Sequence, residues 1–219
     1  MKRYPKITLD YIHFFFKKRL KIVLKELENN FKDRNNLNLL EIGCADGIVL
    51  RRILERMENH FSDIVGIDLS EGMIKEAKNL TIDKKINYFV RGAEKIDKKF
   101  DVIVEVGVVN YADVDKELSY VKNNLNRDGV YILSLAGKGS LNDYFGKGDG
   151  YNNFLSYHEY EDKIRKNFKI SKIIPVGFYL PLIWRVPVLA RVWQFFIEIV
   201  LGPFLPNLFH EKVYILKLK

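Results

Sequence analysis

The stretch "LLEIGCADGIVLRRI", residues 39–53, decides the fold. It starts as an apolar run typical of a buried strand and passes through two glycines four positions apart, Gly43 and Gly47. It then continues with apolar and basic residues at helical spacing. Small residues at the carboxyl end of a parallel strand let backbone N–H groups approach a ligand, and the next helix adds its positive end. The stretch therefore predicts a strand, a ligand-binding turn and a helix.

The rest of the chain alternates between strand and helix patterns. This alternation predicts an α/β protein with a doubly wound, mostly parallel sheet. A helix over residues 8–29 is expected to be capped by Thr8. The expected strands are residues 37–43, 63–70, 86–90, 100–110, 130–136, 169–177 and 212–219, and the other expected helices are 48–57, 71–80, 113–125, 156–168 and 187–201.

Composition and charge narrow the class of protein. The 219 residues fit one domain. The single cysteine, Cys44, rules out an internal disulfide and favours a reducing, cytoplasmic setting. Residues 1–36 hold ten Lys and Arg against four Asp and Glu, a net charge of +6 out of +8 for the chain. This basic segment is either a solvated helix face or a surface for anionic lipid or nucleic acid, and its aromatic residues do not alternate with the charges as RNA stacking would require.

An acidic residue at the end of the next expected strand indicates a ligand with a sugar. Asp68 lies 21 residues after Gly47, where a carboxylate can accept hydrogen bonds from both ribose hydroxyls. The dinucleotide fingerprint G-x-G-x-x-G fits poorly, because Ala45 and Ile48 occupy its second and third glycine positions. The phosphate-binding pattern G-x-x-x-x-G-K-[ST] is absent.

These motifs resemble those of class I S-adenosylmethionine-dependent methyltransferases, of the small-molecule or lipid type that includes the type 11-like enzymes. The first motif of that family, an acidic residue followed by G-x-G-x-G, is matched by Glu41, Gly43 and Gly47, with Ala45 in the middle position. The resemblance covers residues 37–136. It implies a Rossmann-like methyltransferase fold with seven strands, the last of them antiparallel.

The resemblance also implies S-adenosylmethionine as the cofactor and assigns its contacts. The turn from Glu41 to Gly47 would hold the methionine part, Asp68 the ribose, and Leu69 with Met73 the adenine. Gly92 stands where an aspartate is usual. No metal is implied. The full set of implied cofactor-binding residues is Glu41, Gly43, Cys44, Ala45, Asp46, Gly47, Asp68, Leu69, Met73, Gly92, Ala93, Glu94, Glu105 and Val106.

The catalytic residue is not identified from the sequence. Methyl transfer from a sulfonium is a direct displacement, so a base is needed only where the acceptor must lose a proton. Tyr111, His158 and Tyr11 are the candidates, and each can instead be a packing residue. The chain lacks N-P-P-Y, a second cysteine and an acidic metal-binding cluster, which favours a small or lipid-like acceptor. Two alternatives stay open, an RNA-modifying enzyme of the same fold and a non-catalytic cofactor-binding module associated with a membrane enzyme.

An apolar insertion before the last strand is the most individual feature of the chain. Arg185, Arg191 and Glu198 interrupt it, so no transmembrane helix is expected. A helix over 187–201 would carry a narrow polar arc and be apolar elsewhere. It is either a lid or dimer face, or it dips into a membrane interface on the inner membrane face, which Trp184 and Trp193 would suit.

The sequence thus predicts a single methyltransferase domain with five parts. In chain order these are an N-terminal helical cap (1–36), a cofactor-binding core (37–136), a loop, helix and strand (137–176), the apolar insertion (177–211) and the last strand (212–219).

Overall fold

The computed structural model describes residues 6–82, 85–144, 154–178 and 183–219. Within these ranges seven strands form one sheet in the order β3-β2-β1-β4-β5-β7-β6. The strands are β1 Leu37–Ile42, β2 Phe61–Asp68, β3 Ile86–Val90, β4 Phe100–Val106, β5 Leu125–Ala136, β6 Phe168–Val176 and β7 Glu211–Leu218.

The first five strands run parallel, and β7 runs antiparallel to both of its neighbours, β5 and β6. This confirms the predicted mixed sheet with a reversed last strand. Its central strands are apolar over most of their length because both faces are covered by helices. The strand order in the sheet changes direction between β1 and β4. In open α/β sheets a ligand binds in the crevice beside the carboxyl ends of the two strands at this point.

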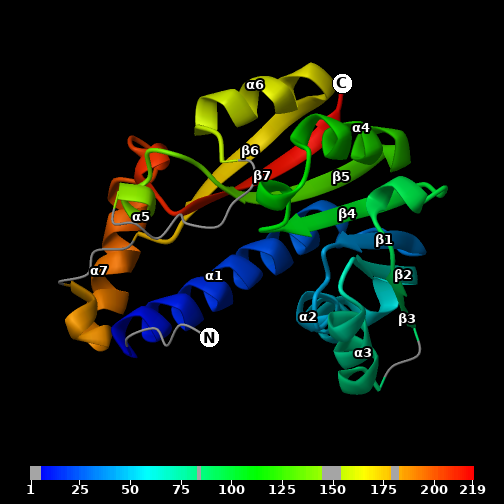
Figure 1. Ribbon diagram of the computed structural model, residues 1–219, viewed down its shortest axis with the longest axis horizontal. Helices are drawn as coiled ribbons and strands as arrows, with labels where there is room; N and C mark the ends of the chain where they lie inside the picture. The colour runs from blue at the N-terminus through cyan, green and yellow to red at the C-terminus, as the bar shows by residue number, and fades with distance from the viewer. Residues whose placement is uncertain (1–5, 83–84, 145–153, 179–182) are drawn as a thin grey trace.

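Helices cover the two faces of the sheet in separate layers (Figure 1). Buried residues of α1, α2 and α3 pack on one face, and those of α4 and α6 pack on the other. The helices are α1 Lys6–Phe31, α2 Ile48–Met57, α3 Glu71–Leu80, α4 Val114–Asn124, α5 Leu141–Tyr144, α6 Tyr157–Asn167 and α7 Pro187–Val200.

Side-chain caps explain where several helices begin. The side chain of Ser70 accepts a hydrogen bond from the backbone of Met73 at the start of α3, and Asp113 does the same for α4. Helix α6 begins with a reciprocal capping box between Ser156 and Glu159. These local signals are readable from the sequence, and the predicted bounds of α3 match the structure.

Some local predictions are wrong. Thr8 does not cap the first helix, because α1 already includes Lys6. The strand expected over 100–110 ends at Val106, and Val109–Tyr111 forms a 3-10 helix. Residues 126–129, which precede the strand expected over 130–136, are part of β5, which starts at Leu125 and pairs with β4 through a register irregularity. A Cβ at Gly129 would lie 2.9 Å from the carbonyl oxygen of Asn126, so the irregularity requires glycine.

The glycine-rich segment 137–157, which opens the part expected as a loop, helix and strand, is only partly described. It contains a bridge between Lys138 and Ser156 and the short helix α5, whereas residues 145–153 lie outside the described residues. The apolar insertion contains α7. No helix in the described ranges is both long enough and apolar enough to cross a bilayer.

A buried ion pair fastens α1 to the sheet. One guanidinium nitrogen of Arg19 lies 2.9 Å and 3.0 Å from the two carboxylate oxygens of Glu211, the first residue of β7. The hydroxyl of Ser134 on β5 donates to the same carboxylate. Burial alone would raise the pKa of Glu211, but the charges of Arg19 and His210 and the hydrogen bonds outweigh it and hold the pKa below its usual value.

We expect Arg19→Met to lower the free energy of unfolding at neutral pH by about 3–5 kcal/mol, because it leaves the Glu211 carboxylate buried without its partner. A carboxyl with a depressed folded-state pKa stabilises the fold above its unfolded pKa and loses this effect as the pH falls, so the difference should shrink in acid. Urea unfolding at several pH values measures it. The double variant Arg19→Met/Glu211→Gln should recover part of the loss; an equally unstable double variant would contradict the explanation.

Candidate active site

The turn after β1 adopts a backbone shape that few side chains tolerate. Gly43, Ala45 and Gly47 have φ of +69°, +46° and +77°. A Cβ at Gly43 would lie 2.2 Å from a methyl carbon of Val108, and one at Gly47 would lie 2.3 Å from the hydroxyl of Tyr88. Glycine is therefore required at both positions by backbone conformation and by close approach. Ala45 holds the same left-handed conformation with a side chain, which adds local strain.

Asp68 ends β2 and is fixed by backbone donors on both sides. Its Oδ2 accepts a hydrogen bond of 3.0 Å from the N–H of Ala45, and its Oδ1 accepts one of 2.8 Å from the N–H of Ser70. The first bond joins the turn after β1 to the end of β2, and the second joins β2 to the start of α3. The carboxylate thus has a set orientation at the carboxyl edge of the sheet.

A cleft of about 530 Å³ opens beside this carboxylate. Small-molecule sites typically measure about 300–1,000 Å³, so its size is ordinary for a ligand of this class. It is formed where β1, β2, β3 and β4 end. Its lining consists of Ile42, Gly43, Ala45, Ile67, Asp68, Leu69, Arg91, Gly92, Ala93, Glu94, Val106, Gly107, Val108, Tyr111, Ala112 and Glu117.

The structure brings together eight of the residues assigned to the cofactor from the sequence. They line the cleft together with the catalytic candidate Tyr111, and they are Gly43, Ala45, Asp68, Leu69, Gly92, Ala93, Glu94 and Val106. The other assigned residues lie around the cleft and do not line it: Glu41, Cys44, Asp46, Gly47, Met73 and Glu105.

Other residues of the cleft wall were not assigned to the site from the sequence. Glu117, in the first turn of α4, and Arg91, just after β3, both reach the cleft, and Arg91 directly precedes the assigned Gly92. Their position follows from the packing of α4 and of the loop after β3 over the sheet edge.

Three carboxyl groups lie in or beside the cleft, two of them buried and the third, Glu117, partly buried. Burial raises the pKa of Glu41 well above its usual value, and the nearby charges of Asp46 and Asp68 raise it further. Burial and the charge of Glu117 raise the pKa of Glu105 to about 8, although the hydroxyl of Tyr131 donates a hydrogen bond to it. Burial and the charge of Glu94 raise the pKa of Glu117 to about 7.

Each of these three groups keeps an unused acceptor. One side-chain oxygen of Glu41, one of Glu105 and one of Glu117 has no hydrogen-bond partner among the described residues. Buried polar atoms are normally satisfied, so three orphaned oxygens around one cleft indicate that a ligand with positive or donor groups belongs there.

The three catalytic candidates lie in different surroundings. Tyr111 is half exposed on the cleft wall. His158 is exposed on α6, 3.0 Å from Asp162, and does not line the cleft. Tyr11 is buried, and its hydroxyl lies 3.1 Å from Nδ1 of His210, whose pKa is lowered by burial.

A second hollow, of about 420 Å³, adjoins the cleft and shares two of its wall residues, Ala45 and Val106. The other side is formed by one face of α1 and the start of α2. Its remaining lining residues are Phe16, Lys17, Arg19, Leu20, Val23, Ile48 and Val49. The hollow is mostly apolar, with two cationic side chains among its lining. The N-terminal helix thus covers this pocket as expected, whereas no described residue of the apolar insertion lines it.

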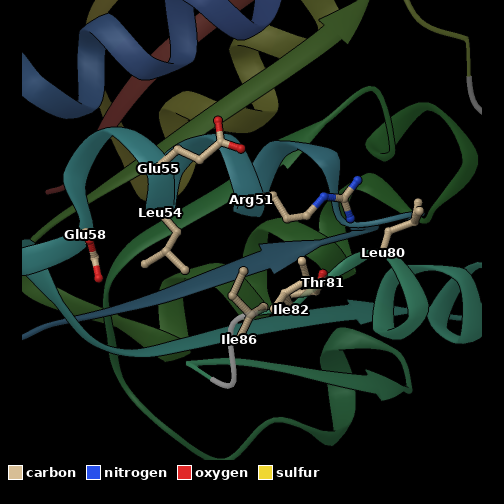
Figure 2. A pocket seen from close by; sticks show the side chains of 8 residues that line it. All are labelled: Arg51, Leu54, Glu55, Glu58, Leu80, Thr81, Ile82 and Ile86. Carbon is tan, nitrogen blue, oxygen red and sulfur yellow. The ribbon is translucent and has the colours of Figure 1, made fainter.

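Figure 2 shows a third hollow, which lies apart from these two. It measures about 330 Å³ and is framed by side chains of α2, the end of α3 and the start of β3. Arg51 and Glu55 project from α2, and Leu80 and Ile82 come from the segment that leads to β3 (Figure 2). None of the residues assigned to cofactor or catalysis lines it.

Comparison with known proteins gives the same picture as the geometry. Residues 40–131 match the family model described as "Methyltransferase domain". These residues form a methyltransferase domain of the class I S-adenosylmethionine-dependent type. The predicted family resemblance is thereby confirmed.

Two curated relatives and one solved structure illustrate the similarity of this methyltransferase to known proteins. It is 33% identical over 105 residues to the malonyl-[acyl-carrier protein] O-methyltransferase 2 of Ilyobacter polytropus, covering 46% of this chain and 40% of the relative. It is 29% identical over 117 residues to the mitochondrial ubiquinone biosynthesis O-methyltransferase of Saccharomyces cerevisiae, covering 50% and 37%. The chain therefore spans less than half the length of either relative.

The solved structure is magnesium protoporphyrin IX methyltransferase from Synechocystis PCC 6803 with bound S-adenosylmethionine. It superposes with a TM-score of 0.66 at 12% identity, over 100% of this chain and 86% of that one. At this identity the match supports the fold alone, and it confirms the predicted Rossmann-like methyltransferase fold.

We expect Glu105→Gln to change how the stability of this methyltransferase depends on pH. A carboxyl whose pKa rises from 4.5 to about 8 on folding holds its proton in the folded state, so it lowers stability progressively as the pH rises through that window. The neutral amide removes this loss. Each pKa unit corresponds to about 1.4 kcal/mol, so the variant should be more stable than the wild type at pH 9 by up to a few kcal/mol.

Urea unfolding at pH values about one unit below 4.5, within the window and about one unit above its upper end measures the effect. The two proteins should be equally stable at the lowest pH. If the free energy of unfolding of Glu105→Gln depends on pH as steeply as that of the wild type, another group holds the proton.

Proposed function

We propose that this protein transfers a methyl group from S-adenosylmethionine to a small or lipid-like acceptor. The observation that carries the proposal is the clamped carboxylate of Asp68 beside the left-handed turn of Gly43 to Gly47. An oriented carboxylate suits a ribose diol, and a turn of small residues leaves room for the backbone to approach an amino-acid tail. Both features face one cleft of suitable size.

The residues around the cleft fit this cofactor. S-adenosylmethionine carries a sulfonium and an ammonium group, and when bound it supplies an activated methyl group. Glu41, Glu105 and Glu117 offer unpaired acceptors around the cleft, and Asp68 and Glu94 add carboxylates to its wall. The raised pKa values favour the neutral form of Glu41, Glu105 and Glu117. A bound cation would favour their charged form, which in turn stabilises the cation. We assign the ribose to Asp68, the adenine to the side of Leu69 and Met73, and the methionine part to the turn and Glu41.

The adjoining hollow is the proposed acceptor site. It meets the cleft at Ala45 and Val106, so an acceptor bound there would lie next to the methyl group. Positioning two reactants in this way can lower a barrier by about 7–11 kcal/mol without any catalytic base. Phe16 and Leu20 give the hollow an apolar wall, and Lys17 provides positive charge for an acidic group.

The same geometry disfavours the RNA-modifying alternative. Carboxylates of Asp68, Glu94 and Glu117 line the cleft, and they would repel a phosphate backbone that approached it. Tyr111 remains the candidate for contact with the acceptor, because it is the only one of the three proposed catalytic residues that lines the described cleft.

We expect S-adenosylmethionine to bind with micromolar affinity, and NAD not to bind, in isothermal titration calorimetry. Asp68→Ala should weaken the binding by about 1.5–3 kcal/mol, roughly 10–150-fold, because a charged hydrogen-bond partner is lost. Asp63→Ala is the matched control: Asp63 lies on the same strand, pairs with Lys98 and does not line the cleft. Equal affinities for the two variants would contradict the assignment of Asp68.

We expect Phe16→Ala to slow methyl transfer to an apolar acceptor by about tenfold, because it removes part of the acceptor wall. The measurement is incorporation of labelled methyl groups into a cell lipid extract. Affinity for the cofactor should stay unchanged, since Phe16 does not line the cleft. Leu80→Ala is the control, because Leu80 is as exposed as Phe16 (47% against 48%) but lines the hollow of Figure 2. A lower cofactor affinity in Phe16→Ala would contradict the assignment, because it would place Phe16 in the cofactor cleft and not in the acceptor hollow.

A further inference from the structure

Helix α7 is inverted relative to an ordinary surface helix, in the sense that its large apolar side chains face solvent. Between residues 186 and 205, eleven large apolar side chains are 47–79% exposed, among them Val192, Trp193, Phe196 and Ile199. The residues of α7 that are buried are Ala190 and Gln194. A surface helix of a globular protein normally buries its apolar stripe, so this helix presents to solvent the face that would otherwise form a core.

Polar contacts hold the helix in this orientation. Glu198 forms an ion pair with Lys18 of α1, and the side-chain amide of Gln194 donates to Glu198 at 2.9 Å. Just before α7, Trp184 is buried against Tyr11 and Phe14 of α1, with ring centroids 5.2 Å and 5.4 Å apart. Gln194 and Glu198 of the polar arc predicted from the sequence therefore face the protein, while Arg191 is exposed. Trp184, expected at an interface, is a core residue.

Positive charge borders the apolar face. A groove of about 770 Å³ runs between α7 and the neighbouring α1 and β6, and four lysines line it against one glutamate. The lysines are Lys18, Lys21, Lys25 and Lys172, and Phe195 and Ile199 of α7 line the same groove. Burial, and to a smaller extent the charge of Lys21, lowers the pKa of Lys18 to about 8.

This combination favours a membrane over a second copy of the chain. An isologous dimer through α7 would bring the lysines of both copies toward each other, and like charges at an interface are unfavourable. An anionic bilayer offers the complementary surface, with acyl chains for the apolar face and negative headgroups for the lysines beside it. Exposed apolar patches of this extent on a soluble domain commonly mark an interaction surface.

We propose that the apolar face of α7 inserts into the interfacial layer of an anionic lipid bilayer, with the exposed lysines of the adjoining groove, Lys21 and Lys25, in contact with the headgroups. Lys18 and Lys172 are paired with Glu198 and Glu26. The helix lies in the plane of the membrane and does not span it. This surface is separate from the cofactor cleft, so the proposal does not depend on methyl transfer.

The two tryptophans provide an internal probe. Trp193 is 57% exposed on the proposed contact face, whereas Trp184 is 1% exposed inside the protein. We expect vesicles of phosphatidylcholine and phosphatidylglycerol with brominated acyl chains to quench and blue-shift the fluorescence of Trp193. Trp193→Phe keeps an apolar side chain at the site, so it should still co-sediment with the vesicles but show no quenching.

Charge substitutions test the apolar face of α7 and the lysines beside it separately. Phe196→Glu should lower the vesicle partition coefficient at least tenfold, and the double variant Lys21→Glu/Lys25→Glu should abolish the preference for anionic over neutral vesicles. Ile82→Glu is the control, because Ile82 is 98% exposed in the segment before β3, outside the proposed surface. Circular dichroism and cofactor titration verify that each variant is folded.

Three results would overturn the proposal. The first is no partition of the wild type into anionic vesicles at low salt, where surface electrostatics are strongest. The second is quenching that persists in Trp193→Phe. The third is a dimer in vesicle-free buffer that Phe196→Glu converts to a monomer, which would assign the apolar face to a second copy of the chain.

Discussion

The hydrogen bond from the N–H of Ala45 to the carboxylate of Asp68 is the constraint on which the site depends. It joins the ends of β1 and β2 and requires the turn between Gly43 and Gly47 to keep its left-handed backbone. The strain at Ala45 is sustained because the sheet fixes both ends of the turn, with β1 paired in parallel to β2 and β4. A rigid scaffold that holds a costly local conformation is a common arrangement at functional sites. Here it leaves the carboxylate and the small-residue turn facing one cleft.

Charge is sorted between two parts of the molecule. Acidic side chains collect around the cleft, where burial raises the pKa of Glu41, Glu105 and Glu117. Basic side chains collect along α1 and its groove with α7. The net charge of +8 therefore says little about the site itself, because the positive excess lies elsewhere. A cationic cofactor and an anionic surface would be attracted to different regions, so neither would compete with the other.

The sequence predicts the sheet well because its signals are local. Apolar strands, the capping residue Ser70 and the spacing between Gly47 and Asp68 need no knowledge of distant contacts. Glu117 was missed because it reaches the cleft only through the packing of α4 on the sheet. The direction of α7 was left open for the same reason: periodicity reveals a polar arc but not which way it faces. The ion pair between Glu198 and Lys18, 180 positions apart in the chain, decides it.

Helix α1 connects the two proposed surfaces. Phe16, Leu20 and Val23 line the acceptor hollow, while Lys18, Lys21 and Lys25 line the groove beside α7. At about 100° per residue these two sets fall on different faces of one helix. A protein docked through α7 would therefore hold its acceptor hollow one helix diameter, about 10 Å, from the groove at the membrane. An apolar acceptor dissolved in the bilayer would then have a short path along α1 to the cofactor. The apolar hollow and the inverted helix, which are unrelated in sequence, become parts of one arrangement if the acceptor is lipid-like.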